Sequence, residues 1–298
     1  MQPIATWLVA RPRNGVIGLA LTFFFPLGPV LSSLVMAHLV YANGVRVPAI
    51  QGLVATALLS TLAIVLQTSV FQVVASAAIW WLPVFVFAAM AGYWRSVPLA
   101  LQVSVMIAMM VTVGYFIVLG DPSEYWNEAI VMTIELARQT GLHAQADMLS
   151  QSQQLIVPQM TMLFVFTVWS FYVAITLAGY VLFQTLPDKG RIYGRFCDLN
   201  FGRVIAVIMA GSSVGAVLTG WAWLQNLGFV AFAVFWLQGL AILHWLRSEK
   251  HMPVLVLIAT YALLPFLMVL LVIPLAVLGY MDAWFDFRAR ARLKNNKA

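Results

Sequence analysis

Charged residues and cysteine are both scarce in this 298-residue chain. Only 9% of the residues are charged whereas 63% are hydrophobic, and Cys197 is the only cysteine. A soluble domain carries about 25% charged residues, so the composition excludes an ordinary soluble enzyme. It also excludes a disordered chain, a coiled coil and a small disulfide-bonded scaffold. The composition therefore indicates an integral membrane protein with several membrane-spanning segments.

The surplus of positive charge lies mainly at the C-terminus. The net charge is +6, and the last eleven residues carry five basic side chains, namely Arg288, Arg290, Arg292, Lys294 and Lys297. A basic segment next to a membrane binds anionic lipid head groups. We therefore expect a basic tail over 281–298 that contacts the lipid bilayer, and no nucleic-acid-binding face.

Long stretches without a charged residue predict the membrane segments. They cover 14–45, 47–94, 96–120, 148–187, 204–246 and 251–281. A helix needs about 20 apolar residues to cross the hydrocarbon, so the second and fifth stretches hold two crossings each and the total is about eight. Segments of this length close their backbone hydrogen bonds in lipid only as helices. The sequence predicts an all-α, polytopic integral membrane helix bundle.

The positions of the basic residues predict the topology. Eight full crossings would divide the 16 basic residues evenly between the two sides. If the first and last stretches instead fold back, every basic residue except Arg138 lies on one side. The positive-inside rule favours this arrangement. We therefore expect a multi-pass protein of the bacterial cytoplasmic (inner) membrane with both termini in the cytoplasm.

Prolines occur where this topology needs breaks. The run Phe25-Pro26-Leu27-Gly28-Pro29 interrupts the first stretch, and Pro265 and Pro274 interrupt the last. Proline removes a helical hydrogen bond and clashes with the preceding turn. We expect the first stretch, and by the same argument the last, to form short paired helices. A single kinked helix is the alternative for each stretch.

The only long polar insertion covers 121–157 and is acidic. Its charged residues are Asp121, Glu124, Glu128, Glu135 and Asp147 against the single base Arg138. Trp126, Ile130 and Ile134 recur at helical spacing opposite the glutamates, which predicts an amphipathic helix ending near Gly141. A second helix is expected to follow. In the favoured topology the insertion lies outside the membrane, where it caps a cavity, docks a partner or only connects two spans.

A serine motif in the fifth charge-free stretch, 204–246, resembles a catalytic pattern. Residues 211–215 read Gly-Ser-Ser-Val-Gly, which matches the G-x-S-x-G nucleophile motif, but that motif needs a strand-to-helix turn. Small residues at intervals of four let helices approach closely. We interpret this segment as a helix-packing face with the members Ala206, Ala210, Ser212, Ala216 and Gly220.

The sequence lacks the motifs that are typical of several chemical functions. The chain has no Walker loop and no dinucleotide fingerprint, and its four histidines show no metal-ligand spacing. No acidic residue lies in the middle of a membrane stretch, where ion-coupled transporters usually keep one. We therefore expect a protein that is not an enzyme, has no cofactor and does not hydrolyse ATP. The intramembrane amides join helices or hold a neutral ligand.

The C-terminal run Leu278-Gly-Tyr-Met-Asp-Ala-Trp-Phe-Asp-Phe-Arg-Ala-Arg290 resembles the end of the YybS-like family of bacterial membrane proteins. The proline-broken region 19–44, the acidic insertion and the run Phe235-Trp-Leu-Gln-Gly-Leu-Ala-Ile242 resemble that family as well. The family is distantly similar to the substrate-binding S components of energy-coupling-factor transporters. That resemblance implies a six-helix core whose helices lie near 15–25, 29–41, 49–67, 70–94, 99–120 and 157–186.

The resemblance and the charges together predict the organisation of the chain. We expect a cytoplasmic or interfacial N-terminus over 1–14 and an S-component-like core over 15–186. A basic cytoplasmic loop over 187–203, further membrane helices over 204–280 and the basic tail over 281–298 follow. The C-terminal motif is expected to anchor the tail at the membrane surface, or to dock a cytoplasmic partner, through Asp282, Trp284, Asp286, Arg288 and Arg290. If one helix continues through the motif, Asp282, Asp286 and Arg290 lie at i, i+4 and i+8, and an Asp–Arg pair at i, i+4 caps and orients the tail.

Two functional hypotheses follow from the sequence. The first is an S-component-like membrane protein that binds a small solute or takes part in its transport without an ATPase of its own. The second is a membrane scaffold or assembly factor that recruits a membrane or cytoplasmic protein partner through its basic tail and acidic insertion.

Overall fold

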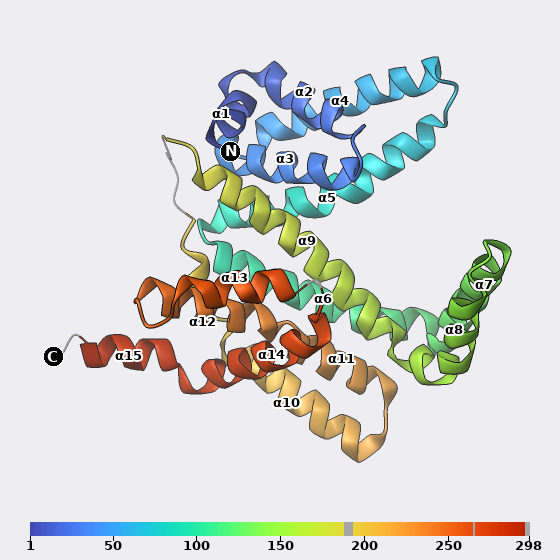
Figure 1. The fold of residues 1–298 in the computed structure, drawn as a ribbon, viewed down its shortest axis with the longest axis vertical. Helices are drawn as coiled ribbons and strands as arrows, with labels where there is room; N and C mark the ends of the chain where they lie inside the picture. Colours follow the sequence, from blue (N-terminus) through green and yellow to red (C-terminus); the bar gives the residue numbers. More distant parts are fainter. Residues whose placement is uncertain (188–192, 265, 296–298) are drawn as a thin grey trace. The chain divides into compact units, whose positions relative to one another are not determined.

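The computed structural model describes residues 1–187, 193–264 and 266–295. Within these ranges the chain is helical and contains no strand, so the predicted all-α class is confirmed (Figure 1). The α-helices are α1 (Gln2–Ala10), α2 (Pro12–Thr22), α3 (Gly28–Asn43), α4 (Arg46–Val65), α5 (Val70–Trp94), α6 (Val97–Leu119), α7 (Ser123–Gln139), α8 (His143–Ile156), α9 (Met160–Gln184), α10 (Gly202–Thr219), α11 (Ala222–Ala233), α12 (Phe235–Ser248), α13 (Val254–Leu263), α14 (Met268–Phe285) and α15 (Phe287–Asn295). Two single 3-10 turns, η1 (Val157–Gln159) and η2 (Phe196–Asp198), lie between them.

Among the described residues, six helical segments are long and apolar enough to cross a membrane. They are Arg46–Val65, Val70–Trp94, Val97–Leu119, His143–Gln184, Gly202–Thr219 and Ala222–Ser248. The apolar helices Val254–Leu263 and Leu270–Phe285 are shorter. By length and composition these helices are compatible with a multi-pass membrane protein, and the predicted number of about eight segments stays a prediction.

The chain divides into two compact units. One unit consists of Met1–Leu101 and Ser170–Phe196, and the other of Gln102–Trp169 and Cys197–Ala298. The boundaries that the sequence predicts, at 15–186 and 204–280, stay predictions. Part of the predicted basic loop, with Lys189 and Arg191, lies outside the described residues, as does Lys297 of the tail.

In the first unit the first apolar stretch is two helices. Helix α2 ends at Thr22, and Leu27 adopts a left-handed conformation with φ of 60° before α3 begins. The hydroxyl of Ser32 donates to the carbonyl oxygen of Leu19 at 2.8 Å, and the indole N–H of Trp81 donates to the same hydroxyl oxygen at 2.9 Å. These buried bonds hold α2 against α3 and α3 against α5.

Close packing and long-range hydrogen bonds complete the first unit. A Cβ on Gly179 of α9 would lie 2.4 Å from the Cβ of Ala37, so only glycine allows this approach to α3. The imidazole Nε2–H of His38 donates to the carbonyl oxygen of Ala5 at 3.1 Å, which holds α1 against α3. The histidine is fully buried and serves as a packing residue there.

In the second unit the last apolar stretch contains α13 and α14. Pro265 lies outside the described residues. Pro274 does not break the chain as the sequence predicts, because α14 runs through it from Met268 to Phe285. Apolar helices tolerate an internal proline when neighbouring groups satisfy the freed carbonyl. The prediction of a break at Pro274 is therefore wrong.

Candidate functional site

The acidic insertion folds into a hairpin of α7 and α8, as its spacing predicts. The carboxylate of Asp121 accepts a hydrogen bond from the backbone N–H of Ser123 at 3.0 Å at the start of α7. Such a bond satisfies an N–H group that the first helical turn leaves free. Trp126, Ile130 and Ile134 follow at steps of four residues and are buried in the core of the hairpin. The exposed faces of α7 carry the three glutamates and several apolar side chains.

Trp126 fastens the hairpin to the ends of α6 and α9. Its indole N–H donates to the hydroxyl oxygen of Thr161 at 2.8 Å. Its ring stacks on Tyr115 with centroids 6.0 Å apart and packs against Phe164 with centroids 5.4 Å apart. Because these partners come from both α6 and α9, the base of the hairpin has a fixed orientation on the two helices.

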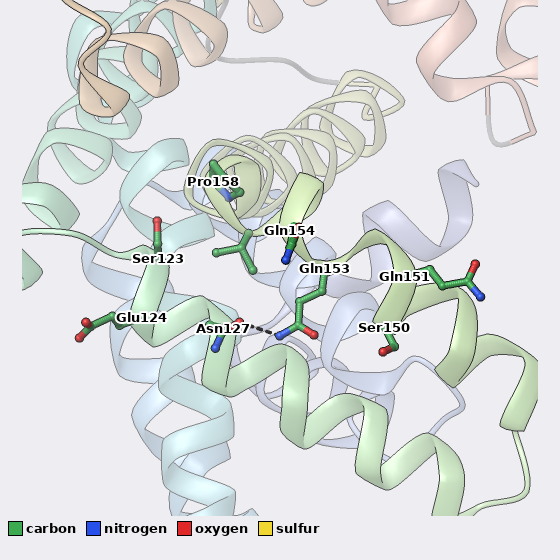
Figure 2. A pocket seen from close by; sticks show the side chains of 9 residues that line it. Ser123, Glu124, Asn127, Ser150, Gln151, Gln153, Gln154 and Pro158 are labelled. Atoms are coloured by element: carbon green, nitrogen blue, oxygen red, sulfur yellow. Dashed lines mark hydrogen bonds between the residues drawn. The ribbon is translucent and has the colours of Figure 1, made fainter.

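An open groove of about 770 Å³ lies along the hairpin (Figure 2). Both helices and the η1 turn line it, with Ser123, Glu124, Asn127, Ser150, Gln151, Gln153, Gln154, Val157 and Pro158. This volume is within the range of about 300–1,000 Å³ that small-molecule sites occupy. The lining is mostly amides and hydroxyls, and Glu124 is its only charged side chain.

Two of the groove's amide side chains are held in place by a hydrogen bond to each other. The amide N–H of Gln153 donates to Oδ1 of Asn127 at 2.6 Å, which joins the two helices across the groove (Figure 2). A primary amide offers two donors and an acceptor with two lone pairs, so both side chains retain hydrogen-bonding capacity after this contact. A surface of amides and hydroxyls suits the donors and acceptors of an uncharged polar molecule.

A second polar cluster contains the acidic and basic residues of the C-terminal motif. The Nη2 group of Arg288 donates to Oδ2 of Asp282 at 2.7 Å, and its Nε group donates to the same oxygen at 3.2 Å. The amide of Gln238 donates to this oxygen at 2.8 Å. Asp282 is fully buried and Arg288 is 5% exposed. Sequence reasoning placed Arg288 at the lipid surface, but the structure places it in the interior of the second unit.

The change of backbone direction at Asp286 explains this difference. Asp286 adopts a left-handed conformation with φ of 49°, so α14 ends before it and α15 begins after it. The motif is therefore not one continuous helix, so the condition on which an Asp–Arg pair at i, i+4 is expected does not hold. The turn brings Arg288, six residues along the chain, back against Asp282.

The cluster also holds the segment between η2 and α10. Arg288 donates to the carbonyl oxygens of Cys197 and Leu199, each at 2.7 Å. The side-chain oxygen of Gln238 accepts from the backbone N–H of Phe201 at 2.7 Å. Backbone groups in an apolar region need such partners because no water replaces them. The ion pair therefore acts as the fastening point of this buried segment.

Two glycines bring α12 and α14 close enough to form the cluster. A Cβ on Gly239 would lie 2.0 Å from the carbonyl oxygen of Leu275, and a Cβ on Gly279 would lie 2.2 Å from that of Phe235. A glycine on each helix thus removes the side chain that would separate the backbones. This contact also places Gln238 opposite Asp282.

The other members of the motif lie at the surface. Trp284, Asp286 and Arg290 are exposed, and the side chain of Trp284 makes an edge-to-face contact with Tyr280. These residues remain available for the predicted anchoring at the membrane surface. Asp282 and Arg288 are the two members that the structure buries apart from them.

The serine motif lies inside helix α10, and its small residues take different positions. Ala206, Ser212 and Ala216 are buried and Ala210 is half-buried. The hydroxyl of Ser212 donates to the carbonyl oxygen of Ile208 at 2.7 Å within the same helix. Gly220 is exposed and ends α10 in a left-handed conformation with φ of 70°, so its role is that of a helix cap and not of a packing residue.

Sequence reasoning did not single out the groove or the glycine contact. The run Ser150-Gln-Ser-Gln-Gln154, which is polar and free of charge, is the signal for the groove. For the contact, the signal is a glycine next to the intramembrane amide Gln238 and another three residues before Asp282. Within the described ranges no three histidine, cysteine or acidic side chains gather in a way that could hold a metal ion.

Comparisons with known proteins identify no relative. Searches against protein-family models, curated proteins and solved structures each give no match.

Proposed function

We propose that this protein is a multi-pass protein of the bacterial cytoplasmic membrane that binds a small, uncharged polar solute in the groove between α7 and α8. It takes part in the uptake or handling of that solute and has no ATPase of its own. The observation that carries the proposal is the groove's lining, in which amides and hydroxyls from two helices converge and one side chain is charged. The resemblance to S components, which are substrate-binding membrane proteins, supports the same function.

The groove's shape supports binding of a molecule of small-metabolite size. Val157 and Pro158 provide apolar surface beside the polar side chains. The hydrogen bond between Gln153 and Asn127 holds amides of both helices in place before any solute arrives. Such preorganisation lowers the entropy cost of binding.

Exchanging two groove amides for leucine should weaken binding. The variant Asn127→Leu/Gln154→Leu loses hydrogen bonds that contribute about 0.5–1.5 kcal/mol each, so we expect affinity to fall about 10- to 100-fold. Native mass spectrometry of the gently purified full chain, with a panel of uncharged sugars and polyols added, measures the bound fraction. Gln145→Leu is the matched control, because this exposed amide on α8 is not part of the lining. Equal retention by both variants would place the solute elsewhere.

Cysteine labelling tests the orientation that the positive-inside rule predicts. In a Cys197→Ser background, Arg46→Cys at the start of α4 should face the cytoplasm. It should therefore stay unlabelled when a membrane-impermeant maleimide is added to intact cells. Glu135→Cys on α7 should react with a membrane-impermeant maleimide added outside. Labelling of both positions from the same side would contradict the arrangement with paired first helices.

A further inference from the structure

The α7–α8 hairpin has an exposed apolar face on the side away from the groove. We call this the outer apolar face and define it as Tyr125, Met132, Leu136, Met148 and Leu155. Leu155 is 73% exposed, Met148 69%, Met132 67% and Leu136 61%. A polar hairpin that exposes this much apolar side-chain surface indicates that another surface covers this face in the membrane-bound protein.

Helical geometry places all five side chains on one side of the hairpin. With about 100° per residue, Met132 and Leu136 lie on one side of the buried row through Ile130, and the groove residue Asn127 lies on the other. On α8, Met148 and Leu155 are likewise separated from the groove residue Gln154. Because the two helices are antiparallel and pack together, the two apolar stripes meet on the same face.

The chain on both sides of the hairpin places it where apolar helices end. Helix α6 ends at Leu119 and α7 begins at Ser123, and α9 begins at Met160 directly after η1. Figure 1 shows α7 and α8, in green, running crosswise to the ends of α6 and α9 that carry them. The contacts of Trp126 with Tyr115 and Thr161 fix that orientation.

The groove and the outer apolar face lie on opposite sides of the hairpin. Figure 2 shows the groove's amides between α7 and α8, next to Pro158. A hairpin that lies across the ends of α6 and α9 presents one of its two sides to a membrane that those helices cross. The apolar side is the one that lipid accommodates.

The charges of the hairpin indicate which force would hold it on a lipid surface. The glutamates are exposed on α7: Glu124 lines the groove, and Glu128 and Glu135 lie between the groove and the outer apolar face. Arg138 is the only basic residue of the insertion, and it pairs with Asp147 at 3.4 Å. A surface with this acidic edge has no electrostatic attraction to anionic head groups. Burial of apolar side chains is the remaining driving force.

We propose that the α7–α8 hairpin lies flat on the bilayer, with Tyr125, Met132, Leu136, Met148 and Leu155 in the lipid interface and the groove open to water. The occupant of the outer apolar face is the acyl-chain boundary of the membrane that α6 and α9 cross. This inference requires these helices to span the membrane and does not require the groove to bind a solute.

Spin labelling of the full chain in phosphatidylcholine nanodiscs tests the proposal. Labels are attached to Leu136→Cys, Met148→Cys and Gln154→Cys, each in the Cys197→Ser background, and all three positions are exposed. Positions 136 and 148 should show several-fold greater accessibility to molecular oxygen than to a water-soluble nickel chelate. Position 154, in the groove, should show the reverse and serves as the matched control.

Two results would overturn the proposal. If the chelate reaches 136 and 148 as readily as 154, the outer apolar face lies in water. If both reagents are excluded from 136 and 148, and the spectra broaden through spin–spin interaction, the face is covered by a second copy of the chain. Solute binding is measured separately by native mass spectrometry, so failure of either proposal leaves the other standing.

Discussion

Replacing Arg288 with methionine should lower the free energy of unfolding by about 3–5 kcal/mol, because it leaves a buried carboxylate without its partner. Asp282 is fully buried and receives two of the hydrogen bonds of Arg288, and the carbonyl groups of Cys197 and Leu199 lose their donors as well. In detergent, thermal unfolding followed by tryptophan fluorescence should show a Tm lower by about 6–15 °C.

Variants at neighbouring positions separate the ion pair from a general effect of the tail. Arg290→Met removes an exposed charge two residues away and should change stability by less than about 0.5 kcal/mol. Adding Asp282→Asn to Arg288→Met removes the uncompensated charge, so the double variant should be more stable than Arg288→Met alone. Equal Tm values for Arg288→Met and Arg290→Met would refute a structural role of the pair.

Adding one methyl group at the α12–α14 contact should also be strongly destabilising. In Gly239→Ala the new Cβ would lie 2.0 Å from the carbonyl oxygen of Leu275, and in Gly279→Ala it would lie 2.2 Å from that of Phe235. The obstacle is backbone in both cases, so the helices must separate. We expect each substitution to cost about 2–3 kcal/mol, measured by chemical denaturation in detergent.

The same substitution elsewhere provides the control. A Cβ on Gly211 of α10 meets no atom within 4 Å, so Gly211→Ala should be neutral or stabilising by up to about 1 kcal/mol through helix propensity. The double variant Gly239→Ala/Gly279→Ala should cost less than twice a single one, because one separation of the helices relieves both collisions. Strict additivity would indicate that the two glycines act at independent contacts.

The sequence predicts the helical class and much of the local architecture because those depend on short-range patterns. Charge-free runs mark the apolar helices, and the run Phe25–Pro29 marks the separation of α2 from α3. The four-residue spacing of Trp126, Ile130 and Ile134 likewise marks the buried face of α7. Each of these signals is contained within a few turns of chain.

The polar clusters depend on features that such patterns do not contain. A continuous helix would place Asp282, Asp286 and Arg290 on one face. The left-handed conformation of Asp286 instead lets Asp282 form an ion pair with Arg288. The groove needs the rotation of α7 relative to α8, which brings Asn127 against Gln153 across 26 positions of sequence. Pro274 shows the opposite error, since a strong local breaker is overridden within α14.

The position of Arg288 in the chain has a consequence for the order of synthesis. Its guanidinium binds the carbonyl oxygens of Cys197 and Leu199, which lie 91 and 89 residues earlier, so it is made well after both of them. Chains fold from the N-terminus as they emerge, so helices α10 to α14 are complete before this arginine leaves the ribosome. The segment before α10 is thus fastened only after α10 to α14 have been made, and a chain truncated before Arg288 leaves Asp282 buried without its counter-charge.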